Sequence, residues 1–174
     1  MIKKFGLLII LFLAYLVGGT IGFFSGVNDS HTTDYSNYSE GTNPLYELSS
    51  HERFLAIFKN NIIVSFNNLL IGTFSFGLLS IFYLFYNGFV FGYVIGRSTQ
   101  IMTFPEIAKA TIPHSFEFLG IVLYGYIGYV FSVYLYTKKA LFKKKTILRM
   151  FIIATIIILV AAIIENYVSM SIPE

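Results

Sequence analysis

The sequence predicts an all-α membrane protein, a polytopic bundle of about five transmembrane helices with one interfacial helix. Hydrophobic residues make up 56% of its 174 residues, and charged residues only 12%. The mean hydropathy of +0.72 describes more apolar surface than a soluble core of this size covers. Several apolar runs also reach the roughly 20 residues that a helix needs to cross the hydrocarbon core of a bilayer. The expected organisation is a single integral membrane domain over residues 1–174.

The distribution of charge indicates membrane topology and not a nucleic-acid partner. The formal net charge is +3, and eight of the twelve Lys and Arg residues stand beside predicted membrane ends, where the positive-inside rule places them. The chain contains no cysteine, which excludes disulfides, thiolate nucleophiles and cysteine-ligated metals. We therefore expect the lipid bilayer, and no nucleic acid, among the partners.

The first predicted crossing spans about 5–26. It follows two lysines, as the core of a signal peptide does, but its apolar run is longer, so a retained helix is expected. The polar stretch 27–60 comes next and is predicted to be an extracytoplasmic loop. The last part of this stretch, 51–60, places apolar side chains on one helical face, which is typical of a short helix at the membrane interface.

The apolar run over 61–96 is too long for one ordinary crossing. Its only turn-like break is Asn87-Gly88, so the sequence predicts two crossings joined there. The shorter of the two is expected to be tilted, re-entrant or unwound if it does not cross fully. The remaining elements are predicted in this order: crossings at 62–85, 88–103 and 116–136, a basic cytoplasmic loop at 137–149, and a crossing at 150–169.

The number of crossings determines the expected orientation. Lys3 and Lys4 should be cytoplasmic, and so should the lysine-rich segment 138–145. An even number of crossings must then separate the two segments, and a reversal at Asn87 provides four. The sequence predicts a multi-pass protein of the cytoplasmic membrane with its N-terminus inside and its C-terminus outside.

Glycines recur at four-residue spacing in the first and third predicted crossings. Such a series gives a helix a smooth face on which a neighbouring backbone can approach closely. Packing within the chain is the favoured interpretation, and a homodimer seam is the alternative. The glycines are Gly18, Gly22, Gly26, Gly88, Gly92 and Gly96.

Ionisable residues inside predicted crossings cost about 2.5 kcal/mol or more each, so those present need a partner or a function. The predicted topology brings four of them, with one asparagine, into the outer leaflet. His114 and Glu117 are three residues apart and share a helical face. The expected intramembrane polar cluster consists of Arg97, His114, Glu117, Glu165 and Asn61.

Three interpretations of this cluster stay open. In the first, Arg97 pairs with Glu117 or Glu165, and the cluster is structural. In the second, the cluster binds or conducts a peptide, a lipid or an ion. In the third, His114, Glu117 and Glu165 hold Zn²⁺ or another divalent metal, or carry protons, in a membrane enzyme. No His-Glu-x-x-His motif or other catalytic signature occurs, so no catalytic residue is assigned and no other cofactor is expected.

Several short motifs follow one another along residues 54–174. The most specific are Pro113-His114 with Glu117, and Ile164-Glu165 near the end of the chain. Weaker ones are Phe58-Lys59-Asn60-Asn61, Gly72, Gly77, Asn87-Gly88 and Gly92. Together, in this order, they resemble the stage II sporulation protein M family.

This resemblance implies a multi-spanning membrane protein of bacteria or archaea. It implies a membrane component or scaffold of a partner complex, in envelope remodelling during sporulation or in the export, maturation or immunity of peptides such as bacteriocins. We therefore expect a non-enzymatic protein with a membrane-protein or peptide partner. The alternative is an intramembrane metal-dependent enzyme that acts on a peptide through His114, Glu117 and Glu165.

Overall fold

The computed structural model describes residues 2–29 and 48–168, and within these ranges all regular structure is helical. Each of its helices is long and apolar enough to cross a membrane. The predicted all-α bundle of five membrane helices is therefore confirmed, and the chain is a multi-pass membrane protein. The helices are α1 (Ile2–Val27), α2 (Ser50–Phe74), α3 (Leu78–Ser98), α4 (Phe104–Thr137) and α5 (Lys144–Val168).

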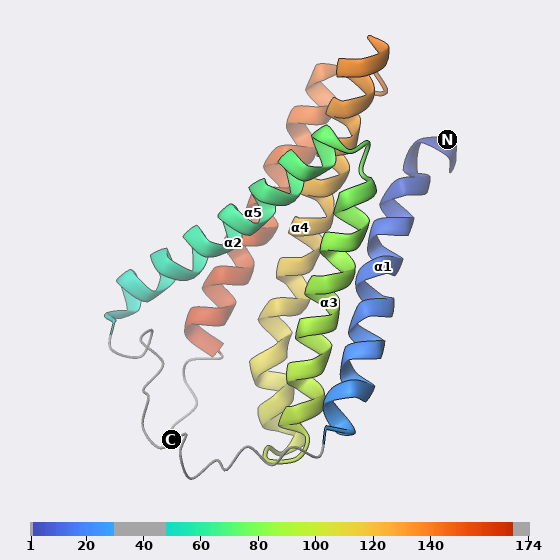
Figure 1. Ribbon diagram of the computed structural model, residues 1–174. Coiled ribbons are helices and arrows are strands. Elements are labelled where there is room, and N and C mark those ends of the chain that lie inside the picture. Colours follow the sequence, from blue (N-terminus) through green and yellow to red (C-terminus); the bar gives the residue numbers. More distant parts are fainter. Residues whose placement is uncertain (1, 30–47, 169–174) are drawn as a thin grey trace.

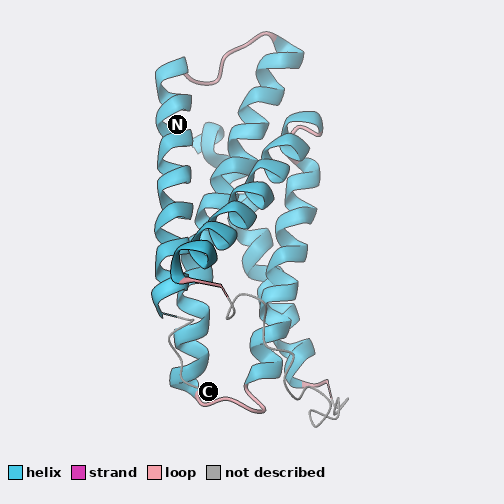
Figure 2. Cartoon of the chain, turned by 90° about the vertical axis from the view of Figure 1, so that its left-hand side faces the viewer, coloured by secondary structure: helices cyan, strands magenta, loops and turns pink. Residues whose placement is uncertain are grey.

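The helices alternate in direction along the bundle (Figure 1). α1 packs chiefly against α3, while α4, the longest helix, packs against both α2 and α5. α2 runs at a steep angle to α1, α3 and α4, as the rotated view in Figure 2 also shows. The start of α1, the turn between α2 and α3, and the start of α5 lie at one end of the bundle, which we call the basic end.

The two predicted glycine series face each other between α1 and α3. A Cβ atom added at Gly18 would overlap the backbone of Phe85, and one added at Gly92 would overlap the backbone of Gly19. Backbones that approach this closely gain dispersion contacts, which drive helix association in lipid. The two series thus pack against each other within one chain, as the favoured interpretation expects.

A second close approach joins α2 to α4, and it was not predicted from the sequence. A Cβ atom at Gly72 would lie 2.8 Å from the carbonyl oxygen of Gly125, and one at Gly128 would overlap the backbone of Leu69. The buried Asn68 crosses this contact and donates its Nδ2 to the carbonyl of Ile121 at 2.9 Å. A hydrogen bond to a backbone carbonyl lets an amide side chain be buried between membrane helices.

The predicted reversal at Asn87-Gly88 is wrong, because the chain turns at 75–77 instead. Gly77 has a φ of +78°, a conformation that glycine adopts without steric cost, and its N–H bonds the carbonyl of Gly72 at 2.9 Å. Asn87 lies inside α3 and donates its Nδ2 to the carbonyl of Tyr83 one turn earlier, at 2.7 Å. An asparagine that bonds its own helix in this way does not break it. The count of crossings between the basic segments stays at four.

Three other boundaries differ from the prediction. No separate interfacial helix occupies 51–60, since α2 begins with a capping box between Ser49 and Glu52 and continues without a break. α4 begins with a capping box between Thr103 and Glu106, well ahead of the predicted crossing at 116–136, and it contains Pro113. α5 begins at Lys144, which shortens the predicted basic loop. Most of the predicted loop 27–60 lies outside the described residues.

Candidate functional site

Three ionisable side chains meet between α4 and α5, and we call them the His-Glu-Glu cluster: His114, Glu117 and Glu165. The Nδ1 atom of His114 lies 3.1 Å from Oε2 of Glu117, and its Nε2 atom lies 4.0 Å from Oε1 of Glu165. One potential ligand atom from each residue falls within 4.8 Å of the other two. The two glutamate side chains are each 14% exposed, and that of His114 is 40% exposed.

Local sequence explains why these side chains converge. His114 and Glu117 are one turn apart on α4, so they share a face. α5 can approach that face because it presents the fully buried alanines Ala161 and Ala162, and because Gly120 of α4 leaves room for the side chain of Ile158. This close packing brings Glu165 of α5 to the opposite side of His114.

Asn61 of α2 is the fourth member of the site. Its side chain is buried, and with the amide nitrogen turned toward its acceptors it donates to Oε1 of Glu117 at 3.2 Å and to the carbonyl of Ile57 at 3.3 Å. A donor in this position stabilises the carboxylate and fixes its rotamer. Asn61 therefore positions Glu117 relative to His114.

A cavity of about 460 Å³ opens beside the cluster, between α2, α3, α4 and α5. The side-chain amides of Asn60, Asn61 and Asn87 line it together with the three ionisable residues. Asn87 had been predicted to form a turn, and its role here was missed. Its position in the middle of an apolar run could have indicated this role, because polar residues in membrane helices usually face a cavity or a partner.

A pair of hydrogen bonds, which we call the clamp, joins α2 to α5 near this cavity. Arg53 donates its Nε to Oδ1 of Asn166 at 3.0 Å, and Nδ2 of Asn166 donates to the hydroxyl of Ser50 at 3.1 Å. Asn166 is buried and directly follows Glu165 in the chain. The clamp thus fixes the last turns of α5, including the carboxylate of the cluster. The sequence analysis did not identify it.

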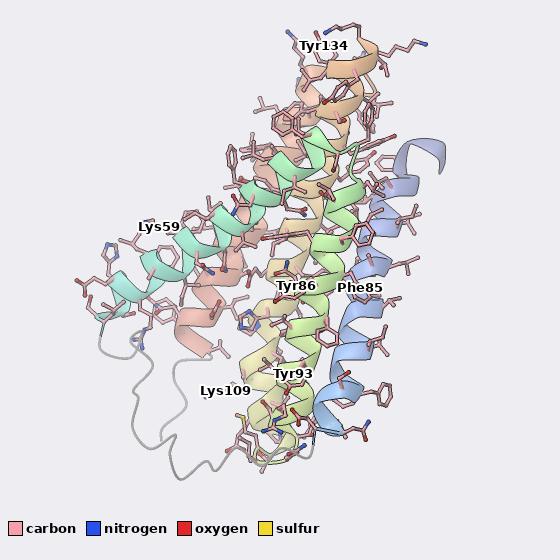
Figure 3. The ribbon with its side chains drawn as sticks, in the orientation of Figure 1. Lys59, Phe85, Tyr86, Tyr93, Lys109 and Tyr134 are labelled. Carbon is pink, nitrogen blue, oxygen red and sulfur yellow. The ribbon has the colours of Figure 1, made fainter. Side chains whose placement is uncertain are left out.

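Arg97 does not join the His-Glu-Glu cluster and pairs with neither of its glutamates, contrary to the first interpretation. Its Nη1 atom donates to the carbonyl of Asp29 at 2.8 Å and lies 3.6 Å from the Asp29 carboxylate. The hydroxyl of Tyr93 also bonds that carboxylate. Tyr93 stands near the end of α3 that lies opposite the basic end (Figure 3). Arg97 therefore ties the end of α3 to the residues that follow α1.

The donor set of the cluster is suited to a cation. One imidazole nitrogen and two carboxylate oxygens are ligands that Zn²⁺ accepts, with a fourth position left for water or substrate. Ligand atoms around tetrahedral zinc lie about 3.4 Å apart, given bonds of about 2.1 Å. The three ligand atoms here lie within 4.8 Å of one another, so the side chains would have to draw closer together to reach that spacing. The same atoms can instead share a proton or accept a cationic group of a partner.

A sequence profile of the stage II sporulation protein M family matches residues 8–170. The chain belongs to this family. The match covers nearly the whole sequence, including every residue of the His-Glu-Glu cluster and both glycine series. No match was found among curated proteins or among solved structures. This member of the stage II sporulation protein M family thus carries the His-Glu-Glu cluster beside a cavity between α2, α3, α4 and α5.

Proposed function

We propose that this stage II sporulation protein M family member is a non-enzymatic membrane component that assists a partner, either an envelope-remodelling complex or an exported peptide. The cavity beside the His-Glu-Glu cluster is the partner-binding site. The single observation that supports this proposal is the convergence of His114, Glu117 and Glu165 on a cavity within the helix bundle. Such groups are too costly in a membrane to persist as simple packing.

The proposed orientation has the N-terminus inside the cell and the C-terminus outside. The start of α1 and the lysine-rich segment 138–145 belong to the same end of the bundle (Figure 1), and basic segments flanking membrane helices favour the cytoplasmic side. Glu165 stands near the far end of α5. The cavity then opens toward the outer half of the bilayer, where an exported peptide or an extracytoplasmic partner domain would meet it.

The charge of the cluster suggests what it recognises. With both carboxylates ionised, the cluster is net negative even when the imidazole carries a proton, and the amides around it offer further hydrogen bonds. A lysine side chain or a free amino terminus of a peptide would complement both features. We propose that the partner presents such a cationic group to Glu117 and Glu165.

The test is partner capture by the full chain in membranes. Glu117→Gln and Glu165→Gln should each reduce co-purification and photo-crosslinking of the partner at least about tenfold, since truncating one member of a desolvated ion pair costs 2 kcal/mol or more. His51→Ala, in the exposed first turn of α2, is the matched control for His114→Ala and should leave capture unchanged. Equal capture by all variants would contradict the proposal.

A second candidate is an intramembrane metal-dependent enzyme acting on a peptide. The observation that favours it is the trio of donor atoms within 4.8 Å, contributed by His114, Glu117 and Glu165. A bound Zn²⁺ would supply Lewis acidity, while Asn61 would orient Glu117. Metal analysis of the purified protein distinguishes the two candidates. Stoichiometric zinc that is lost in Glu165→Gln, together with loss of peptide turnover but normal partner capture in His114→Ala, would favour the enzyme.

A further inference from the structure

A second site lies at the basic end, far from the His-Glu-Glu cluster. A cavity of about 470 Å³ is enclosed by the last turns of α4, the first turns of α5 and the loop that joins them. Tyr134 marks this end of the bundle in Figure 3. The walls of the cavity are formed mainly by Val130, Phe131, Phe142, Ile147 and Phe151.

The lining of this cavity has one charged residue. Lys144 is exposed and lines the cavity together with apolar and aromatic side chains. Lys143 and Thr146, next to it in the chain, line a neighbouring hollow of about 420 Å³. The apolar cavity and the two lysines therefore lie next to each other at the same loop. This is the arrangement that a lipid requires, since its acyl chain and headgroup need different surroundings.

The surrounding charge is uniformly positive. No acidic residue occurs between Glu117 and Glu165 in the sequence. Six basic side chains stand exposed at this end: Lys138, Lys139, Lys143, Lys144, Lys145 and Arg149. Basic clusters that directly flank membrane helices attract anionic headgroups, and those beside a pocket between helices bind them specifically.

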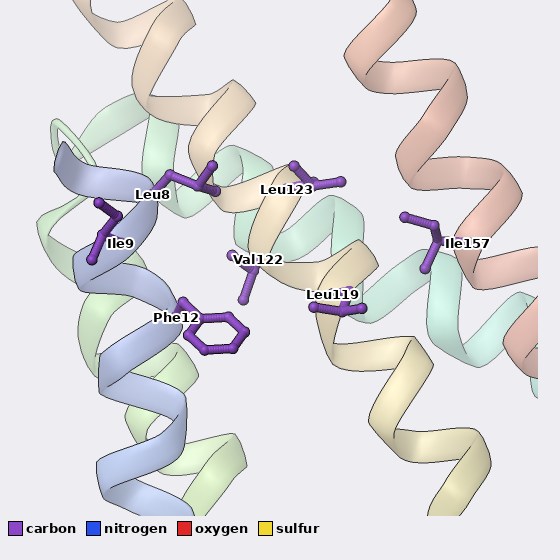
Figure 4. A pocket seen from close by; sticks show the side chains of 7 residues that line it. All are labelled: Leu8, Ile9, Phe12, Leu119, Val122, Leu123 and Ile157. Atoms are coloured by element: carbon purple, nitrogen blue, oxygen red, sulfur yellow. The ribbon is translucent and has the colours of Figure 1, made fainter. Parts of the chain in front are cut away.

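A second apolar hollow provides an internal comparison. A groove of about 390 Å³ runs between α1, α4 and α5, and Leu8, Phe12, Val122 and Ile157 are among its lining residues (Figure 4). None of the described residues that line this groove is charged. It is suited to any acyl chain of the bilayer, without preference for a headgroup.

We propose that the cavity at the basic end is a binding site for an anionic glycerophospholipid. One acyl chain fills the space between Val130 and Phe151, and the phosphate binds Lys143 and Lys144. The bound lipid then joins α4 to α5 at the end opposite the His-Glu-Glu cluster. This inference does not depend on the proposed function of that cluster.

The test uses fluorescence, because the chain contains no tryptophan and a single one reports cleanly. Phe151→Trp is placed in vesicles that contain brominated phosphatidylglycerol or, at equal mole fraction, brominated phosphatidylcholine. Leu148→Trp, whose side chain lines the same cavity and is 60% exposed, is a second reporter that does not disturb packing. Phe12→Trp, in the groove of Figure 4, is the control reporter.

Phosphatidylglycerol should quench both cavity reporters at lower mole fractions than phosphatidylcholine does. The mole fraction that gives half-maximal quenching should fall about fivefold for each lysine that contacts the headgroup. Phe12→Trp should be quenched equally by both lipids. When Lys143→Gln and Lys144→Gln are introduced into the reporter variants, the preference for the anionic lipid should disappear. Lys59→Gln, on the exposed face of α2 (Figure 3), should preserve that preference. Equal quenching by both lipids at the cavity reporters, a preference that survives the lysine substitutions, or the same preference at Phe12→Trp would each overturn the proposal.

Discussion

At the scale of single residues, Asn61 is the clearest position to test, because its buried side-chain amide donates a hydrogen bond to the Glu117 carboxylate. Asn61→Leu removes that donor while keeping a similar volume. The free energy of unfolding should fall by about 1–3 kcal/mol, which is the usual cost of a buried acceptor left without its donor. Thermal unfolding of the detergent-solubilised chain measures the change.

The neighbouring Asn60 provides the control. It is exposed and makes no hydrogen bond to Glu117 among the described contacts, so Asn60→Leu should change the free energy of unfolding by no more than about 0.5 kcal/mol. A matching loss in both variants would mean that the Asn61 amide does not act on Glu117.

The polar residues also show how far sequence alone reaches at this scale. The spacing of His114 and Glu117, together with the predicted topology, was sufficient to gather them with Asn61 and Glu165 into one expected cluster. The partner of Arg97 was not predictable, because Asp29 lies just beyond α1 and only the packing of α1 on α3 brings it near. Contacts within one helix follow from its period, whereas contacts between helices require the fold.

At the scale of helices, the contact between α1 and α3 is the most sensitive to substitution. Gly92→Ala adds a Cβ atom that would overlap the backbone of Gly19, and a backbone cannot rotate away as a side chain can. The two helices must separate, and we expect a loss of about 1–3 kcal/mol in the free energy of unfolding, as for other overpacked cores. Thermal unfolding again measures it.

Gly6→Ala is the matched substitution on α1, since nothing lies within 4 Å of a Cβ atom there. It should be neutral or stabilising by up to about 1 kcal/mol, because alanine favours a helix more than glycine does. Destabilisation of equal size in both variants would contradict close packing at Gly92.

The position of the α2–α3 turn shows where reasoning about elements failed. Asn87-Gly88 has the residue types of a turn, yet the bundle uses Asn87 to line a cavity and Gly88 to pack against the backbone of Tyr15. The true turn is Ser75-Phe76-Gly77, in which only Ser75 and Gly77 are residue types that turns favour. Residue types favour a turn locally, but in a membrane the same types are also used for helix contacts.

At the scale of the whole molecule, both basic segments lie at one end of the bundle, and the proposed orientation places that end in the cytoplasm, as the positive-inside rule favours. The prediction is that Lys139→Cys resists a membrane-impermeant maleimide in intact cells, whereas Gln100→Cys, exposed between α3 and α4, is labelled. The chain has no native cysteine, so each reporter is unambiguous. The reverse labelling pattern would mean that the protein has the opposite orientation in the membrane. The His-Glu-Glu cluster would then open toward the cytoplasm, and its partner would have to be sought among proteins and peptides that have not yet been exported.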